Sequence, residues 1–168
     1  MSNPLDKISL LNPWHLLATG FGSGLSPVVP GTMGTLAAVP LYLLLVQLPL
    51  PAYLILTLLS CFIGVKICQV TSDDMQVHDH GSIVWDEFAG FWITMSVVPL
   101  LGLPAFDWKI LLSGFVLFRF FDMVKPWPIG WLDQKVHGGL GIMLDDIVAG
   151  VMAAVVLYFV CWYADWLV

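Results

Sequence analysis

Two pairs of adjacent carboxylates stand where long apolar runs begin. Asp86 and Glu87 precede one run, Asp145 and Asp146 precede another, and both runs open with the pattern Asp-x-x-Ala-Gly. One aspartate before a helix can cap the free amide groups of its first turn. Adjacent residues on a helix point about 100° apart, so capping accounts for only one carboxylate of a pair. The second carboxylate of each pair requires another role.

The repeated pattern predicts that two helices cross at Gly90 and Gly150. An aspartate and a glycine four positions apart lie on one helix face, and small residues allow two helices to approach closely. The acidic helix ends would then converge, and their mutual repulsion would require a cation. Oxygen ligands alone favour Mg²⁺ or Mn²⁺ over zinc. The pattern is short, and an accidental repeat is the alternative interpretation.

Charged residues also follow one another at three-residue steps in the segment FRFFDMVKPWP. Arg119, Asp122 and Lys125 lie there on roughly one helical face, before Pro126 and Pro128 end the helix. One interpretation is a ladder of charges that reaches the membrane interface. The other is a phosphate clamp, because Arg and Lys suit phosphate oxygens. The sequence leaves both interpretations open.

Two polar segments offer weaker signals. The loop PVVPGTMG supplies Gly31, Thr32 and Gly34, whose amides could form an anion-binding nest, although glycine and proline at a membrane entry usually mark a turn. His78 and His80 are close enough in sequence for a zinc site, but no third nitrogen or sulfur ligand is suitably spaced. We expect these histidines in an interfacial loop, with His80 near the substrate.

Composition indicates a membrane protein. Of 168 residues, 59% are hydrophobic and 11% charged, and the mean hydropathy is +0.90; a soluble domain has about 25% charged residues. A net charge of −6 argues against nucleic-acid binding, which needs a basic face. The length suits a single domain, 1–168, with an all-α fold. The cysteines all lie in apolar runs and are expected to be inert thiols: Cys61, Cys68 and Cys161.

Five apolar runs predict an integral membrane bundle of about four to five helices. A span takes about 20 apolar residues, so the second and fifth runs are long enough. The runs are 35–48, 52–70, 88–103, 110–123 and 147–168. If all five cross, the polar segments 20–34, 71–87 and 124–146 share one face. Five of the six basic residues share that face, which makes it cytoplasmic by the positive-inside tendency; only Lys109 lies opposite.

The lack of two motifs limits the possible nucleophiles for a phosphate hydrolysis. The chain has no Asp-x-Asp, which disfavours an aspartyl-phosphate route, and no cysteine lies six residues before an arginine, which excludes a cysteine-phosphatase loop. A metal-activated water is the economical nucleophile that remains.

Four ordered segments resemble the signature blocks of the phosphatidylglycerophosphatase A family. The likeness runs from about Asn12 to Gly150 through NPWHLLATGFGSGLSPVVPGTMGTLAAVP, HDHGSIVWDEFAG, FRFFDMVKPWPI and GGLGIMLDDIVAG. It implies a multi-pass, Mg²⁺-dependent lipid phosphatase of the bacterial inner membrane. Such an enzyme hydrolyses phosphatidylglycerol phosphate to phosphatidylglycerol and inorganic phosphate.

The residues and the resemblance together give a set of expected roles. The acyl chains would contact the apolar runs, and the oligomeric state stays open. We expect one or two Mg²⁺ ions at the catalytic carboxylates Asp79, Asp86, Glu87, Asp145 and Asp146. We expect the substrate phosphate at Thr32, Arg119 and Lys125, with Asp122, His80 and Gly31 in support.

Two functions from other classes compete with this reading. An ion-coupled transporter component would place its carboxylates deep within the spans, whereas these lie at the ends of the runs. A non-catalytic scaffold would use the Asp-x-x-Ala-Gly faces for packing alone. The CDP-alcohol transferases also use paired aspartates at membrane ends, but their longer signature, D-x-x-D-G-x-x-A-R, is missing here.

Overall fold

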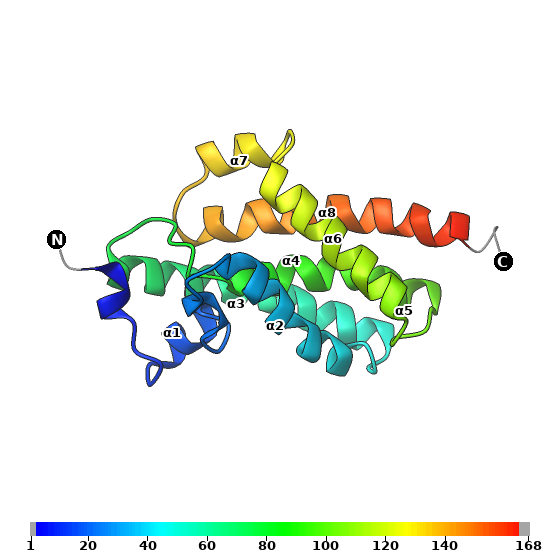
Figure 1. Ribbon diagram of the computed structural model, residues 1–168, viewed down its shortest axis with the longest axis horizontal. Coiled ribbons are helices and arrows are strands. Elements are labelled where there is room, and N and C mark those ends of the chain that lie inside the picture. The colour runs from blue at the N-terminus through cyan, green and yellow to red at the C-terminus, as the bar shows by residue number, and fades with distance from the viewer. Residues whose placement is uncertain (1–2, 165–168) are drawn as a thin grey trace.

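A computed structural model describes residues 3–164, and all regular elements in that range are helices (Figure 1). The all-α prediction is therefore confirmed, while residues 165–168 of the last predicted run lie outside the described residues. The elements are η1 Pro4–Lys7, α1 Pro13–Ala18, η2 Ser23–Leu25, α2 Pro30–Leu45, α3 Leu50–Met75, α4 Trp85–Met95, α5 Val97–Leu101, α6 Trp108–Val124, α7 Ile129–Lys135 and α8 Gly138–Ala164.

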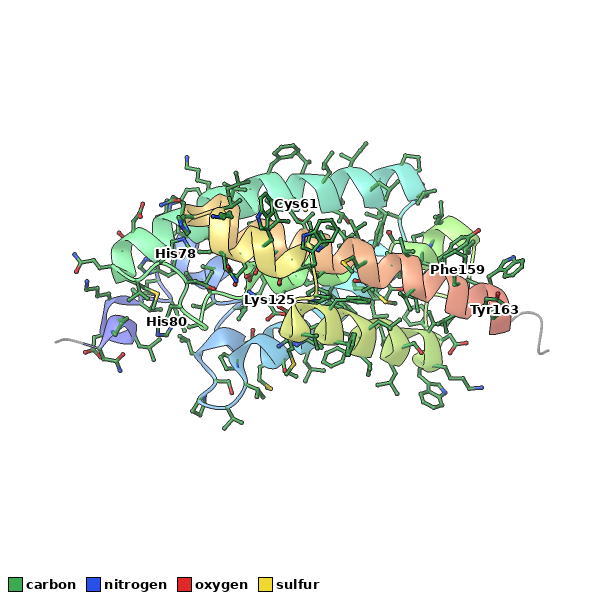
Figure 2. All side chains as sticks on the ribbon, turned by 90° about the horizontal axis from the view of Figure 1, so that it is seen from above. Cys61, His78, His80, Lys125, Phe159 and Tyr163 are labelled. Atoms are coloured by element: carbon green, nitrogen blue, oxygen red, sulfur yellow. The ribbon has the colours of Figure 1, made fainter. Side chains whose placement is uncertain are left out.

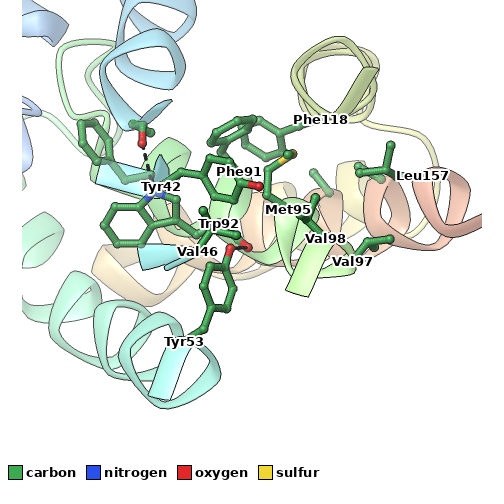
Figure 3. Close-up of a cluster of buried hydrophobic side chains, with 14 of the residues drawn as sticks. Tyr42, Val46, Tyr53, Phe91, Trp92, Met95, Val97, Val98, Phe118 and Leu157 are labelled. Atoms are coloured by element: carbon green, nitrogen blue, oxygen red, sulfur yellow. Dashed lines mark hydrogen bonds between the residues drawn. The ribbon is translucent and has the colours of Figure 1, made fainter. Parts of the chain in front are cut away.

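The short helix α4 forms the centre, and α2, α3, α6 and α8 pack around it (Figure 1). All its residues are buried except Asp86 and Ile93. Aromatic side chains fasten it to its neighbours: Tyr53 of α3 donates a hydrogen bond to the Trp92 carbonyl at 2.6 Å, and the Trp92 ring nitrogen donates to the Ala38 carbonyl of α2 at 3.2 Å (Figure 3). The element that carries the first carboxylate pair is thus held from several sides.

The predicted run 88–103 is not one helix. It is divided at Ser96 into α4 and α5. Pro99 has no amide hydrogen to donate to the Met95 carbonyl, and its ring crowds that carbonyl, so a continuous helix is unfavourable there. The 11 residues of α4 rise only about 16 Å, which is about half the hydrocarbon thickness of a bilayer.

Of the five predicted runs, two correspond to helices that are long and apolar enough to cross a membrane, α3 and α8, judged by length and composition. The helix α2 is apolar but shorter. Large apolar side chains are exposed along both long helices, among them Phe62, which is 68% exposed, and Phe159, which is 52% exposed. Neither helix is therefore buried like the core helix of a soluble protein.

The two ends of the molecule differ in character. The segments 76–84 and 125–137 lie at the end that carries the N-terminus, and the connections 46–49 and 102–107 lie at the other end (Figure 1). In Figure 2, His78 and His80 mark the first end, Phe159 and Tyr163 mark the second, and Lys125 lies nearer the histidines. This agrees with the predicted grouping of the polar segments.

Two helix starts differ from those expected. The helix α2 begins at Pro30, which is favourable at a first helical position, so Gly31, Thr32 and Gly34 belong to helical turns. Their placement in a loop is therefore wrong, and the amides suggested for an anion nest belong to the N-terminal part of α2. The helix α8 begins at Gly138, seven residues before Asp145, so the second acidic pair does not stand at a helix boundary and caps nothing.

The predicted crossing of α4 and α8 at their glycines is confirmed. A Cβ atom on Gly150 would lie 2.4 Å from the Gly90 carbonyl oxygen, and a Cβ atom on Gly90 would lie 2.7 Å from the Asp146 carbonyl oxygen. The Thr94 hydroxyl lies 3.0 Å from the Gly90 carbonyl and 3.2 Å from the Gly150 carbonyl. The crossing brings the two acidic pairs to the same part of the molecule.

We predict that Gly150→Ala lowers the free energy of unfolding by about 1–3 kcal/mol, because the new methyl group must displace the backbone of α4. Thermal or denaturant unfolding in detergent measures this loss. Gly81→Ala is the matched control, since the nearest atom to its added Cβ is 3.6 Å away. Equal stability of the Gly150→Ala variant and the unmodified protein would show that the crossing is not tightly packed.

Candidate functional site

The adjacent carboxylates of α4 face different neighbours. Neither acts as a side-chain N-cap, because Val84 occupies that position and its amide donates to the Ala18 carbonyl at 2.7 Å. Asp86 accepts a hydrogen bond from the Glu87 amide at 3.1 Å. Glu87 contacts α2 and α6, whereas Asp86 lies near Asp145 of α8. The 100° step between adjacent helical residues produces this division.

Glu87 lies in a buried cluster with Thr35, Arg119 and Asp122. Its Oε2 accepts hydrogen bonds from the Thr35 hydroxyl at 2.7 Å and from Nη1 of Arg119. The same Nη1 lies 2.6 Å from Oδ2 of Asp122, one turn along α6. Burial, and secondly the Asp122 charge, raise the pKa of Glu87, while Arg119 and Thr35 lower it; together these effects bring it to about 7.

Gly31 has a steric role in this cluster. A Cβ atom at this position would lie 2.2 Å from Oε1 of Glu87 and 3.2 Å from the Arg119 guanidinium nitrogens. A glycine therefore allows the first turn of α2 to reach the ion pair. Thr35, which the sequence reading missed, lies one turn further along the same helix and is fully buried.

A second cluster forms around Lys125. Its Nζ donates to Oδ1 of Asp133 at 2.8 Å and to Oδ2 of Asp145 at 2.7 Å. Burial lowers the pKa of Lys125, but the bonds and charges of the two carboxylates outweigh this and hold its pKa above the ordinary value, so the ammonium stays charged. Asp133, on α7, was not predicted as a site residue.

The carboxylates between α4 and α8 are close enough to influence one another. Burial holds the pKa of Asp86 well above its ordinary value, and the charges of Glu87, Asp145 and Asp79 add to that rise. Asp145 and Asp146 are buried, whereas Asp79 is exposed in the connection 76–84. Oδ1 of Asp145 is buried and has no hydrogen-bond partner in the described part of the chain.

Further residues of the predicted site, and the neighbouring His78, have the following surroundings. Thr32 is half-buried on α2 and makes no side-chain hydrogen bond within residues 3–164. His80 bonds locally, with Nδ1 2.8 Å from the Ser82 hydroxyl. Asp122 pairs with Arg119 and not with Lys125, which binds carboxylates of α7 and α8. His78 accepts a hydrogen bond from the Gly138 amide at 2.7 Å and so ties the connection 76–84 to α8.

Negative charge dominates the combined site. Seven carboxyl groups face two cations; the carboxyl groups are those of Asp79, Asp86, Glu87, Asp122, Asp133, Asp145 and Asp146, and the cations are Arg119 and Lys125. Three or more His, Cys, Asp or Glu side chains do not form a ready metal cluster anywhere in residues 3–164. The oxygen-only donors and the free Oδ1 of Asp145 fit a hard divalent cation, provided that side chains rotate toward it.

Comparison with known proteins links this site to one family. The family model described as phosphatidylglycerophosphatase A matches residues 16–161. Phosphatidylglycerophosphatase A of Escherichia coli K12 is 58% identical over 92% of this chain and 87% of its own length. The Haemophilus influenzae protein of the same name is 50% identical over 94% of each chain.

A more distant relative carries a different name. A putative phosphatidylinositol-3-phosphatase of Bacteroides thetaiotaomicron is 37% identical over 88% of this chain and 92% of its own length. No solved structure matches the chain.

We predict that Arg119→Met lowers the free energy of unfolding by about 3–5 kcal/mol, because it leaves the buried carboxylate of Glu87 and the half-buried one of Asp122 without their cation. Denaturant unfolding in detergent measures the loss. Lys109→Met removes an exposed cation at the other end of the molecule and should leave stability nearly unchanged. Adding Glu87→Gln to Arg119→Met should recover part of the stability; an undiminished loss would mean that the ion pair does not cause it.

Proposed function

Since this chain belongs to the phosphatidylglycerophosphatase A family, we propose that it hydrolyses phosphatidylglycerol phosphate to phosphatidylglycerol and inorganic phosphate. Water adds to phosphorus, the bond from phosphorus to the glycerol oxygen breaks, and that oxygen leaves with a proton. The names of the two relatives that are 58% and 50% identical to this chain support the substrate.

One structural observation carries this proposal. The site holds both an unpartnered buried acceptor, Oδ1 of Asp145, and an unpartnered buried donor, Nε of Arg119. Such groups are rare in folded proteins because each costs the free energy of its lost hydration. A divalent cation would satisfy the acceptor and a phosphate oxygen would satisfy the donor. A phosphate ester that binds beside a metal ion supplies both.

The proposed cation ligands are the carboxylates between α4 and α8, together with that of the exposed connection: Asp86, Asp145, Asp146 and Asp79. When bound there, Mg²⁺ polarises the phosphoryl group and lowers the pKa of water. Asp145 already shares Oδ2 with Lys125, so its free Oδ1 is the atom that remains for the cation. Lys125 and Arg119 would supply positive charge to the phosphate.

We also propose that the protein is embedded in the bacterial inner membrane with the site toward the cytoplasm. Exposed apolar side chains on α3 and α8 would contact lipid, since water would leave such surfaces costly. The polar end of the molecule would then lie at headgroup height, where a lipid phosphate is found. Lys109 lies in the first turn of α6 at the opposite end, which agrees with the positive-inside tendency. The transporter alternative is not favoured, because the relatives that are 58% and 50% identical to this chain are named as phosphatases.

We predict that purified protein in detergent or vesicles releases inorganic phosphate from phosphatidylglycerol phosphate, that EDTA stops the release, and that Mg²⁺ restores it. Asp86→Asn should lower turnover by about 100-fold or more, because it weakens the cation site. Asp107→Asn is the matched control: Asp107 caps α6 at the far end of the molecule, so this variant should keep its turnover. Full turnover in EDTA would exclude the metal.

Headgroup preference is a separate prediction. We expect faster phosphate release from phosphatidylglycerol phosphate than from phosphatidylinositol 3-phosphate, measured with equal amounts of each lipid in the same vesicles. The preference follows from the higher identity to the two relatives named for the former substrate. Faster release from phosphatidylinositol 3-phosphate would support a lipid phosphatase but contradict the proposed substrate.

A further inference from the structure

The hydroxyl group of Thr35 lies within hydrogen-bond distance of two acceptors. Its Oγ1 lies 3.0 Å from the Gly31 carbonyl of its own helix and 2.7 Å from Oε2 of Glu87. The first contact is the ordinary back-bond of a helical threonine. A hydroxyl has one proton, and a charged carboxylate is the stronger acceptor. The shorter distance therefore marks Glu87 as the partner of the Thr35 proton.

This bond leaves Oε2 of Glu87 fully engaged. It receives the Thr35 hydroxyl and Nη1 of Arg119 together. Oε1 faces the Cα of Gly31, where even a methyl group has no room. A carboxylate enclosed in this way orients its donors rather than presenting oxygens to a cation. Asp86, on the other face of α4, has no such cation partner.

The orientation of Arg119 follows from the same contacts. Nη1 is held by Glu87 of α4 and by Asp122 of α6. A guanidinium is planar, so two anchors on one nitrogen restrict both its plane and the direction of its Nε–H. That Nε is buried and has no partner among the described residues. The donor is thus fixed in place, and no side chain or carbonyl of residues 3–164 accepts its hydrogen.

We propose that Thr35 and Glu87 are positioning residues that aim Arg119 at the substrate phosphate, and that Glu87 is not a ligand of the cation. This rests on the proposed phosphatase function and refines it. The paired carboxylates of α4 then have different roles. Asp86 binds the cation, on what we call the metal side of the site, and Glu87 positions Arg119 on the phosphate side. The prediction of Glu87 as a metal ligand is replaced by this assignment.

The test compares Thr35→Val, which keeps the shape and removes the hydroxyl, with Thr35→Ser, which keeps the hydroxyl. We expect Thr35→Val to raise KM for phosphatidylglycerol phosphate and Ki for inorganic phosphate by about 10-fold, the effect of losing a hydrogen bond to a charged group. The Mg²⁺ concentration for half-maximal activity should not change. Thr35→Ser should restore both constants.

Thr94→Val is the matched control. Thr94 is equally buried on α4, and its hydroxyl bonds backbone carbonyls at the glycine crossing and no charged group. It should lower stability without changing Ki for phosphate. A rise in Ki in Thr94→Val equal to that in Thr35→Val would attribute the effect to packing and overturn the proposal.

Two other results would also overturn it. One is an unchanged Ki in Thr35→Val; the other is a higher Mg²⁺ requirement in place of weaker phosphate binding, which would make Glu87 a metal ligand. Calorimetric titration with inorganic phosphate gives a readout without turnover. If the unmodified protein binds phosphate but releases none from lipid, the proposed function fails while the Thr35 comparison still decides this inference. If it neither binds nor releases phosphate, both fail.

Discussion

The ion pair between Glu87 and Arg119 joins three helices at the centre of the molecule. Glu87 belongs to α4, Arg119 to α6, and the Thr35 hydroxyl that completes the contact to α2. A buried charge without a partner is strongly destabilising, so these helices can be packed only in a way that keeps the three side chains together. Gly31 follows from this constraint, because α2 must approach Glu87 without a side chain between them. The geometry of the proposed phosphate side is therefore also the condition for folding.

The glycine crossing positions the carboxylates proposed to bind the cation, just as the ion pair positions Arg119, which is proposed to bind the phosphate. Contact between Gly90 and Gly150 brings the backbones of α4 and α8 together, and the aspartates four residues earlier in each pattern move with them. Repulsion among these carboxylates opposes that approach. Lys125 offsets part of it through Asp145 and Asp133, and the remaining negative charge is what a divalent cation would neutralise. Helix packing thus brings the carboxylates close together, and binding of a divalent cation would reduce their repulsion.

The sequence predicted the crossing and the basic segment because short patterns with fixed spacing carry them. It did not reveal Thr35 or Asp133, since a threonine inside an apolar run and an aspartate in a polar segment look the same with or without a charged partner. It also predicted five spans, of which two are supported by helix length and composition. Hydropathy cannot separate a helix that faces lipid from one that faces other helices, and α4 is apolar because its neighbours enclose it. The start of α2 at Pro30 was hidden for a related reason, as Gly31 and Gly34 resemble a turn but serve close packing.

Helix length relates the site to the proposed membrane position. The 27 residues of α8 rise about 40 Å, which exceeds a hydrocarbon core of about 30 Å. Trp162 and Tyr163 near its C-terminal end suit the interface on that side. A helix needs about 20 residues to cross the hydrocarbon core. Counted back from Tyr163, this places the opposite edge of the core within one turn of Asp145. The helix α4 starts at the same level as Asp145. Because α4 is too short to span the membrane, it can hold Asp86 and Glu87 at the depth of a lipid phosphate. The surrounding helices would keep lipid away from these charges.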